Sequence, residues 1–260
     1  MLEANKLTGL FTSSGATVQV KQNSGKIGSW GDYYAKQAWK KPVAVLVDRG
    51  SASASEIFAG AIQDYQRGLV VGHRTFGKGT VQALDTLTSG QIKITESKFY
   101  RVTGESTQNK GVTPDIELPS SWDIETSGES SLYLSLPWDT IPPVRYRTFD
   151  IDEDILAAVK KSHLNRLNES PNMKYILNLR ERYDLVKNKK ELSLNIDNRK
   201  KEKAERKDWI FDIENTRREN VGLTRFETYS DMEDFNKEKD EKDLDIDMDS
   251  DYLLQESANI

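Results

Sequence analysis

The chain has 260 residues, a formal net charge of −5, 36% hydrophobic and 30% charged side chains, and no cysteine. The lack of cysteine excludes a disulfide framework, a cysteine zinc site, a thiol nucleophile and an iron–sulfur cluster. The two histidines, His73 and His163, are too few for a histidine-rich metal centre. No apolar run reaches the roughly 18 residues of a membrane span, and the first residues lack the pattern of a secretory signal peptide.

Charge divides the sequence into two parts. Residues 1–120 carry 14 Lys and Arg against 10 Asp and Glu, whereas the remaining residues have a net charge of −9. A polar segment rich in small residues separates them, and such segments are typical of linkers or surface loops. The sequence therefore predicts a first domain over 1–120, a linker over 121–149, and a charged helical domain with an acidic tail over 150–260.

The first part alternates strand and helix patterns. Residues 42–47 and 69–72 are short β-branched runs, as in strands buried on both faces of a sheet. Residues 53–66 between them have apolar residues near helical spacing, so the three segments predict a parallel βαβ unit and an α/β fold. Residues 80–84 and 91–100 alternate more and predict hairpin strands with one wetter face.

The second part has the pattern of helices. Apolar stripes predict helices over 151–159 and 173–186, and residues 198–219 form a third, highly charged candidate. Asp243, Asp245, Asp247 and Asp249 resemble the start of a calcium loop, but Met248 and Leu254 stand where that loop needs Gly and Glu. The prediction for the C-terminal end is a solvated acidic tail.

A serine-rich segment, residues 48–57, follows the first buried strand and opens the helix. Small residues at a strand-to-helix turn let the backbone approach a ligand, and the helix start offers unpaired N–H groups. A serine held there can expose its hydroxyl, with the next N–H directed at a developing oxyanion. The alternative is a serine-rich helix N-cap without a catalytic role.

A second segment, Gly72-His-Arg-Thr-Phe-Gly-Lys-Gly-Thr80, follows the second buried strand. Gly72 and Gly77-Lys78 have the spacing of a phosphate-binding loop, but Gly79 replaces the hydroxyl residue and Thr80 begins a strand pattern. A lysine desolvated between two glycines can be neutral and accept a proton from a serine. His73 is the competing base, whereas His163, in the charged part, is predicted to be a surface or packing residue.

At these residues the sequence resembles the C-terminal processing peptidases, also called tail-specific proteases. Residues 50–57, Gly-Ser-Ala-Ser-Ala-Ser-Glu-Ile, resemble the nucleophile motif of that family, and residues 75–82, Thr-Phe-Gly-Lys-Gly-Thr-Val-Gln, resemble its lysine motif. Residues 99–115 are similar to the segment that closes the catalytic fold. The charged half is similar to the C-terminal region of the long, tail-specific branch.

The resemblance implies a crotonase-like or ClpP-like α/β core, incomplete at its N-terminus, followed by a mainly helical domain. It implies that Ser53 is the nucleophile, that Lys78 is the general base, that Gln82 orients the lysine, and that the N–H of Ala54 is one oxyanion donor. No metal or organic cofactor is expected. A second oxyanion donor, a PDZ domain and a signal peptide are expected upstream, with the full-length protein in the periplasm of a Gram-negative bacterium.

The main hypothesis is therefore a serine-type endopeptidase. The alternatives are a truncated non-catalytic remnant or binding module that retains the motifs, and a nucleotide-binding protein based on residues 72–80. The expected partners are protein substrates with exposed C-terminal tails. An adaptor protein or a homo-oligomer stays open, membrane association is expected to be peripheral or absent, and nucleic-acid binding is not expected because no basic stripe with interleaved aromatics is present.

Overall fold

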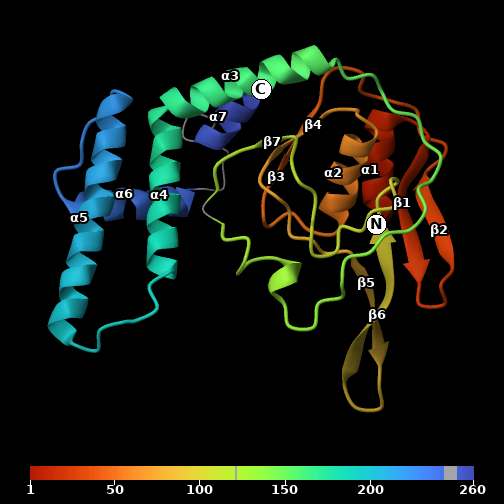
Figure 1. The fold of residues 1–260 in the computed structure, drawn as a ribbon, viewed down its shortest axis with the longest axis horizontal. Helices are drawn as coiled ribbons and strands as arrows, with labels where there is room; N and C mark the ends of the chain where they lie inside the picture. The colour runs from red at the N-terminus through yellow and green to blue at the C-terminus, as the bar shows by residue number, and fades with distance from the viewer. Residues whose placement is uncertain (121, 243–250) are drawn as a thin grey trace. The chain divides into compact units, whose positions relative to one another are not determined.

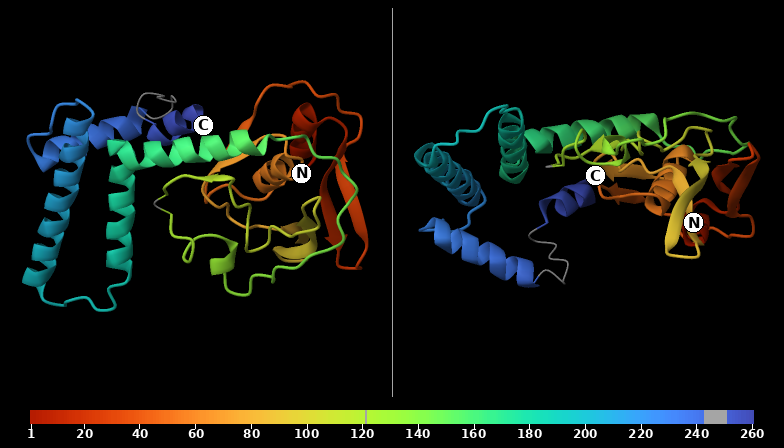
Figure 2. Two further views of the ribbon diagram at one scale, coloured as in Figure 1. Left: turned by 45° about the horizontal axis from the view of Figure 1, so that its top comes forward. Right: turned by 90° about the horizontal axis from the view of Figure 1, so that it is seen from below.

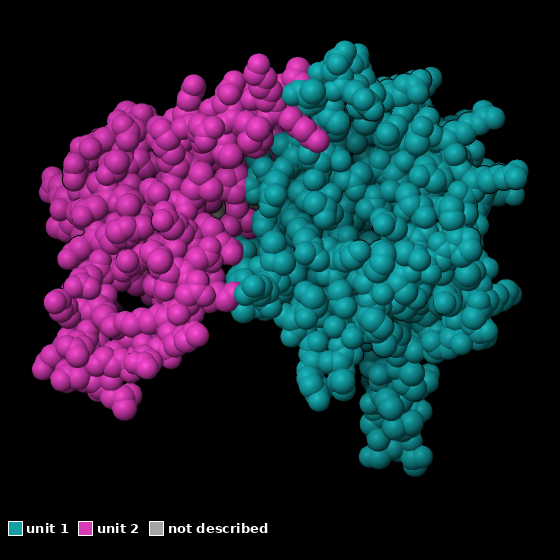
Figure 3. Space-filling model, viewed as in Figure 1, with its two compact units in different colours: residues 1–118, 122–157 teal, residues 119–121, 158–260 magenta. Residues whose placement is uncertain are grey.

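The computed structural model describes residues 1–120, 122–242 and 251–260, and Figure 1 labels their helices and strands. These residues form two compact units, which are coloured separately in Figure 3. Unit 1 comprises residues 1–118 and 122–157, and unit 2 comprises residues 119–121 and 158–260. The candidate residues Ser53 and Lys78 both lie in unit 1.

Unit 1 combines an N-terminal helix, α1 (Leu2–Thr12), with an antiparallel and a parallel sheet in its described part. The antiparallel sheet has the strand order β2-β1-β6-β5, formed by β1 (Gly15–Gln22), β2 (Ile27–Asp32), β5 (Thr80–Thr86) and β6 (Gln91–Tyr100). The parallel sheet has the order β3-β4-β7, formed by β3 (Ala44–Val47), β4 (Leu69–Gly72) and β7 (Ile116–Glu117).

Helix α2 (Ala54–Asp64) connects β3 to β4, and these two strands pair in parallel, with Val45 opposite Val70. The predicted parallel βαβ unit is therefore confirmed. Ala59 of α2 packs in one buried cluster with residues of both strands. Because the carboxyl ends of neighbouring parallel strands meet at one edge of a sheet, the segments that follow β3 and β4 begin side by side.

Burial on both faces was predicted for both strands, and it holds for only one of them. Val70 and Val71 of β4 are completely buried. On β3, Val45 and Val47 pack in the cluster with α2, but Leu46 is 47% exposed, so the prediction for this strand is wrong. Leu46 points to the opposite face because side chains alternate along a strand, and no described residue fully covers that face.

The predicted hairpin is confirmed, because β5 and β6 pair antiparallel from Thr80–Lys98 to Thr86–Gln91. Strands β1 and β2 were not predicted from the sequence. Strand β1 buries polar residues, Thr17 and Gln19, among its apolar ones. The Gln19 amide donates to the carbonyls of Arg101 and Pro142, both distant in the sequence. These long-range bonds allow polar residues to lie inside the sheet.

The segment predicted as a linker, residues 121–149, is largely packed on unit 1 in the structure; residue 121 lies outside the described residues. Val144, Tyr146 and Phe149 pack against a buried cluster that contains Tyr65. The Tyr65 and Tyr146 rings meet edge to face with their centroids 5.4 Å apart. Residues 122–149 thus bury apolar side chains against the βαβ unit.

The described helices of the second half are α3 (Glu153–Glu169), whose first turn belongs to unit 1, α4 (Pro171–Lys187), α5 (Ile196–Asn220), α6 (Tyr229–Lys242) and α7 (Tyr252–Asn259). The three predicted helices are confirmed as α3, α4 and α5. Local signals explain two of the starts: the Ser170 hydroxyl accepts from Met173 N–H before Pro171, and the Asn195 side chain accepts from two N–H groups of α5. Figure 2 shows α4 and α5 lying side by side.

The prediction of a solvated acidic tail is wrong for its last part. The calcium-like residues Asp243, Asp245, Asp247 and Asp249 lie outside the described residues, but α7 follows them and packs within unit 2. The Glu256 side chain of α7 is 6% exposed, and its carboxylate accepts from His163 Nδ1 at 2.8 Å and Arg166 Nη2 at 2.8 Å. A buried ion pair between α3 and α7 therefore holds the C-terminal helix. No described helix is long and apolar enough to cross a membrane.

Replacing Glu256 by Gln should lower the free energy of unfolding by about 1–3 kcal/mol at neutral pH, because the buried His163 and the partly exposed Arg166 lose a charged acceptor. Burial raises the pKa of the Glu256 carboxyl, but the hydrogen bonds from Arg166 and His163 outweigh burial and lower the pKa below 4.5. The stabilisation is therefore present above pH 4.5 and is lost as the pH falls through the lowered pKa. Urea denaturation followed by circular dichroism at several pH values measures both effects.

The matched control is Glu219→Gln, because Glu219 forms an exposed pair with Arg225. Loss of an exposed pair should cost less than about 1 kcal/mol. Equal effects of the two substitutions, or an effect of Glu256→Gln that persists at low pH, would contradict a buried ion pair that secures α7.

Candidate active site

Ser53 lies on the turn between β3 and α2, where it is the residue immediately before the helix. Its backbone has φ +58° and ψ −108°, a conformation that non-glycine residues rarely adopt. The preceding turn is fixed by Asp48, whose Oδ1 accepts from the N–H groups of Gly50 at 2.9 Å and Ser51 at 3.0 Å. A strained, half-buried serine at a strand-to-helix turn is typical of nucleophile turns.

The N–H of Ala54 follows Ser53 at the first residue of α2. Ala54 is exposed, and its N–H donates to no acceptor among the residues that the structure describes. The first N–H groups of a helix have no intrahelical partner and carry the positive end of the helix dipole. This N–H group is therefore available to a negatively charged oxygen beside Ser53.

The Glu56 side chain joins the serine turn to the lysine loop. Glu56 is completely buried, and its Oε2 accepts from Ser53 N–H at 2.8 Å and from Lys78 N–H at 2.9 Å. Its Oε1 accepts from Gly77 N–H at 2.7 Å and from the Thr75 hydroxyl at 2.5 Å. The backbones of Ser53 and Lys78 are thus joined through a single carboxylate oxygen, which accepts one hydrogen bond from each.

The electrostatics of this carboxylate reflect two opposed effects. Burial raises the pKa of the Glu56 carboxyl, while the hydrogen bonds from Thr75, Gly77, Ser53 and Lys78 act to lower it. All four donors are satisfied at once only by an ionised, acceptor-only carboxylate, since a protonated carboxyl turns one O–H against a donor. The geometry therefore fits the charged form.

Further hydrogen bonds hold the loop that carries Lys78, residues 75–79. Phe76 N–H donates to the Ser51 carbonyl at 2.9 Å, which is a second bond between the two segments. The Arg49 guanidinium is 1% exposed and donates to the carbonyls of Thr75, Ser127 and Ile124. Residues of the 122–157 segment therefore secure the loop that carries Lys78.

The two glycines beside Lys78 permit a close approach of another backbone segment. Gly77 has φ +94°, and a Cβ at Gly79 would lie 2.7 Å from the N atom of Gln108. In the available space, Asn109 N–H donates to the Gly77 carbonyl and Gly79 N–H donates to Gln108 Oε1, both at 2.8 Å. The residues on both sides of Lys78 are therefore hydrogen-bonded to the 108–109 segment.

The structure joins the backbones of Ser53 and Lys78 through Glu56, with Ala54 next to Ser53. Their side chains are not hydrogen-bonded to each other among the described residues. No hydrogen bond joins the Ser53 hydroxyl to Lys78 Nζ in the described part of the chain; Lys78 Nζ lies 3.5 Å from Thr80 Oγ1. Gln82 lies exposed on β5 opposite Thr95, and no described hydrogen bond joins it to Lys78. The structure therefore joins the backbones of the predicted dyad through Glu56, and no hydrogen bond joins its two side chains among the described residues.

The two histidines, the alternatives to Lys78 as a base, lie in other environments. His73 is buried directly after β4, where its backbone N–H donates to the Val47 carbonyl. His163 lies in unit 2 against Glu256. The nucleotide hypothesis lacks support, because Thr80 begins strand β5 and not the helix N-terminus that would hold phosphates. The described residues contain no group of three or more His, Asp or Glu side chains arranged to hold a metal ion.

Glu56, Thr75 and Thr80 were not predicted as site residues from the sequence. A signal for Glu56 was present, because Ser53 and Glu56 have the spacing of a helix capping box, in which the acid reaches back to the N-cap N–H. The bonds from Glu56 to Gly77 and Lys78 depend on tertiary contacts, and no local pattern indicates them.

Comparisons with known proteins identify the family of the chain. Residues 1–118 match the model of peptidase family S41, and residues 122–260 match the model described as the C-terminal domain of tail specific protease (DUF3340). The chain belongs to the tail-specific, or C-terminal processing, proteases of peptidase family S41.

Individual relatives are similar over part of their length. A tail-specific protease of Haemophilus influenzae is 40% identical over 183 residues, which cover 66% of this chain and 26% of that protein. A carboxy-terminal-processing protease of Bartonella bacilliformis is 38% identical over 146 residues, covering 50% of this chain and 32% of that protein. A solved structure of a photosystem II D1 C-terminal processing protease is 35% identical, with a TM-score of 0.40 over 44% of this chain and 30% of that one. The chain thus spans about a quarter to a third of these relatives' length.

Replacing Glu56 by Gln should separate the serine turn from the lysine loop. The amide nitrogen cannot accept, so the two donors that face it lose their acceptor, at about 1–3 kcal/mol for each buried donor. Urea denaturation should show lower stability, and amide hydrogen exchange should show faster exchange at Ser53, Gly77 and Lys78. Glu96→Gln, an exposed change on β6, is the control. Unchanged protection at these amides in Glu56→Gln would show that the carboxylate does not hold the two segments.

Proposed function

We propose that this chain carries the catalytic residues of a serine-type endopeptidase that cleaves proteins with exposed C-terminal tails. Membership of the tail-specific protease family supports the class of reaction. The observation that carries the assignment of residues is the pair of hydrogen bonds from Ser53 N–H and Lys78 N–H to one oxygen of Glu56. This arrangement keeps a nucleophile and a candidate base on adjacent backbone segments.

In the proposed acylation step, Ser53 Oγ attacks the carbonyl carbon of the scissile bond. Neutral Lys78 Nζ takes the hydroxyl proton as the Oγ–C bond forms. The tetrahedral oxyanion receives a hydrogen bond from Ala54 N–H at the start of α2. Lys78 then gives its proton to the leaving amine as the C–N bond breaks, which leaves an ester on Ser53 and a neutral lysine.

In the proposed deacylation step, a water molecule attacks the Ser53 ester. Lys78 takes a proton from the water, and the resulting oxyanion uses the same N–H of Ala54. Collapse of this intermediate releases the carboxylic acid product, and Lys78 returns its proton to Ser53 Oγ. The cycle consumes one water molecule and restores both side chains.

The remaining parts of the proposal concern the surroundings of the dyad. Gln82 is proposed to orient the Lys78 side chain once substrate is bound, since it lies on β5 four residues after the lysine. Unit 1 is proposed to be part of a crotonase-like or ClpP-like catalytic core. The whole protein is proposed to act in the periplasm, without a metal or organic cofactor.

Ser53→Ala and Lys78→Ala should each reduce peptide cleavage by a factor of about 10³ or more while the fold is retained. The substrate is an unfolded protein with an apolar C-terminal tail, and products are identified by mass spectrometry. The assay uses the 260-residue chain, together with a chimera in which residues 1–118 replace the matching part of the Haemophilus influenzae relative. The chimera supplies the remaining length of a family member.

The matched controls are Ser55→Ala, an exposed serine of the same motif, and Lys93→Ala, an exposed lysine on β6. Both should retain cleavage. Full turnover in Lys78→Ala would exclude the lysine as base. A chimera that folds but cleaves nothing with all of its residues intact would favour the non-catalytic remnant over the peptidase.

A further inference from the structure

Unit 2 has an apolar hollow at the ends of α4 and α5 that the described residues leave open. The hollow has a volume of about 830 Å³, and four aliphatic side chains form its apolar lining: Leu185, Val186, Leu192 and Ile196. Leu192 and Ile196 are 64% and 63% exposed. Leu194, between them on the connection from α4 to α5, lies outside the hollow and is fully exposed. We call Leu194 and these four residues the α4–α5 patch.

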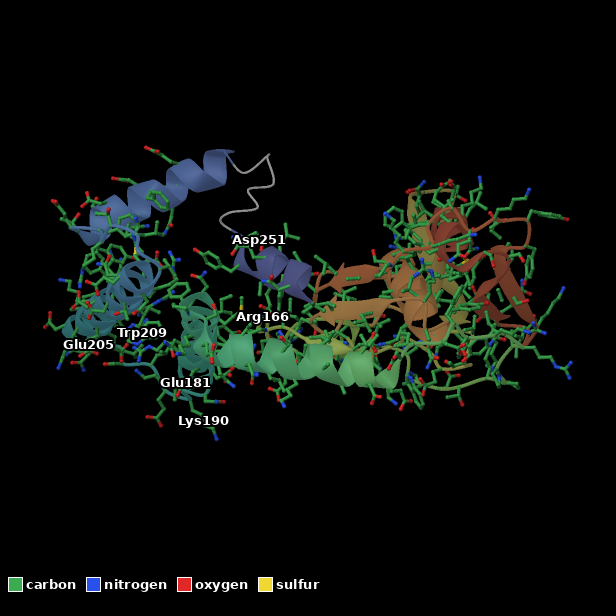
Figure 4. The ribbon with its side chains drawn as sticks, turned by 90° about the horizontal axis from the view of Figure 1, so that it is seen from above. Arg166, Glu181, Lys190, Glu205, Trp209 and Asp251 are labelled. Atoms are coloured by element: carbon green, nitrogen blue, oxygen red, sulfur yellow. The ribbon has the colours of Figure 1, made fainter. Side chains whose placement is uncertain are left out.

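The patch is surrounded by cations. Residues 187–207 contain nine Lys and Arg against four Asp and Glu, although the whole chain has a net charge of −5. Glu202, on the rim, is already paired with Lys189 and Arg199. Figure 4 labels Lys190 at the connection, with Glu181 and Glu205 on the neighbouring helices. Among the described residues of this stretch, Lys190, Lys200, Lys203 and Arg206 have no acidic partner, and Lys207 lies over the Tyr229 ring.

Exposed leucine side chains are unfavourable in water, and the cations around them attract anions, so the two together match a partner that is both apolar and anionic. We propose that the α4–α5 patch docks unit 2 on an anionic lipid surface. Leu194 and its neighbours enter the boundary between headgroups and acyl chains, and the lysines extend their ammonium groups to the lipid phosphates. This surface role is distinct from the peptidase site and does not depend on it.

The shape of the patch favours a lipid surface over a peptide partner. A peptide seated in the hollow would cover Leu192 and Ile196 but would leave Leu194, which lies outside it, in water. A fluid lipid surface adapts to both the hollow and the protruding leucine. The charge also agrees, because a protein with a net charge of −5 is repelled by anionic vesicles unless a local basic patch meets them.

Vesicle co-sedimentation of the 260-residue chain tests this proposal. The chain should bind vesicles with about 30 mol% phosphatidylglycerol and should not bind pure phosphatidylcholine vesicles. Binding should weaken strongly between about 0.05 M and about 0.5 M salt, because added ions screen exposed charges. Lys200→Gln/Lys203→Gln should reduce partitioning about 25-fold, at about fivefold for each lysine near the surface. Leu194→Ser should reduce it about tenfold.

The charge-matched control is Lys160→Gln/Lys161→Gln, two exposed lysines of α3, and the apolar control is Leu223→Ser, which lies after α5. Both controls should bind vesicles like the unchanged chain, and circular dichroism checks that every variant is folded. Absence of vesicle binding, or equal losses in patch and control variants, would overturn the proposal. Binding of an acidic amphipathic peptide that depends on the patch, without vesicle binding, would assign the patch to a protein partner and also overturn it.

Discussion

The buried Glu56 carboxylate is the interaction on which the candidate site depends. Ser53 and Lys78 are separated by a helix and a strand, and each lies on an irregular segment that could adopt many conformations. Glu56 accepts one backbone hydrogen bond from each of them on the same oxygen. Its other oxygen ties down Thr75 and Gly77. Removing such a carboxylate from water is costly, and the four donors offset that cost only while both segments stay in place.

The rest of unit 1 supports this connection. The parallel pairing of β3 and β4 starts the two segments at one edge of the sheet, and α2 presents the N–H of Ala54 beside the serine. Arg49 fixes the back of the lysine loop through backbone carbonyls of residues 75, 124 and 127. The glycines at 77 and 79 allow residues 108 and 109 to close over it. The positive φ of Ser53 is then a strain that the surrounding bonds maintain.

Apolar spacing and helix caps, which are patterns within a short stretch of sequence, were enough to predict several elements. The βαβ unit, the β5–β6 hairpin and the three central helices follow from apolar spacing and from caps such as Ser170 and Asn195. Long-range contacts account for the differences. Strand β1 hides Gln19 because distant carbonyls accept its amide protons, and α7 is held by a pair between Glu256 and His163, 93 residues apart. The candidate residues of the site came from motifs and a family resemblance, whereas the connecting role of Glu56 required the fold.

Trapping the covalent intermediate tests directly whether Ser53 is the nucleophile. The chimera with residues 1–118 is mixed with an activated peptide ester, quenched in acid, digested and mapped by mass spectrometry. We expect an ester adduct on Ser53 and on neither Ser51 nor Ser55. Ester hydrolysis without any adduct, or an adduct on another serine of the 50–57 segment, would contradict the assignment of Ser53 as the nucleophile.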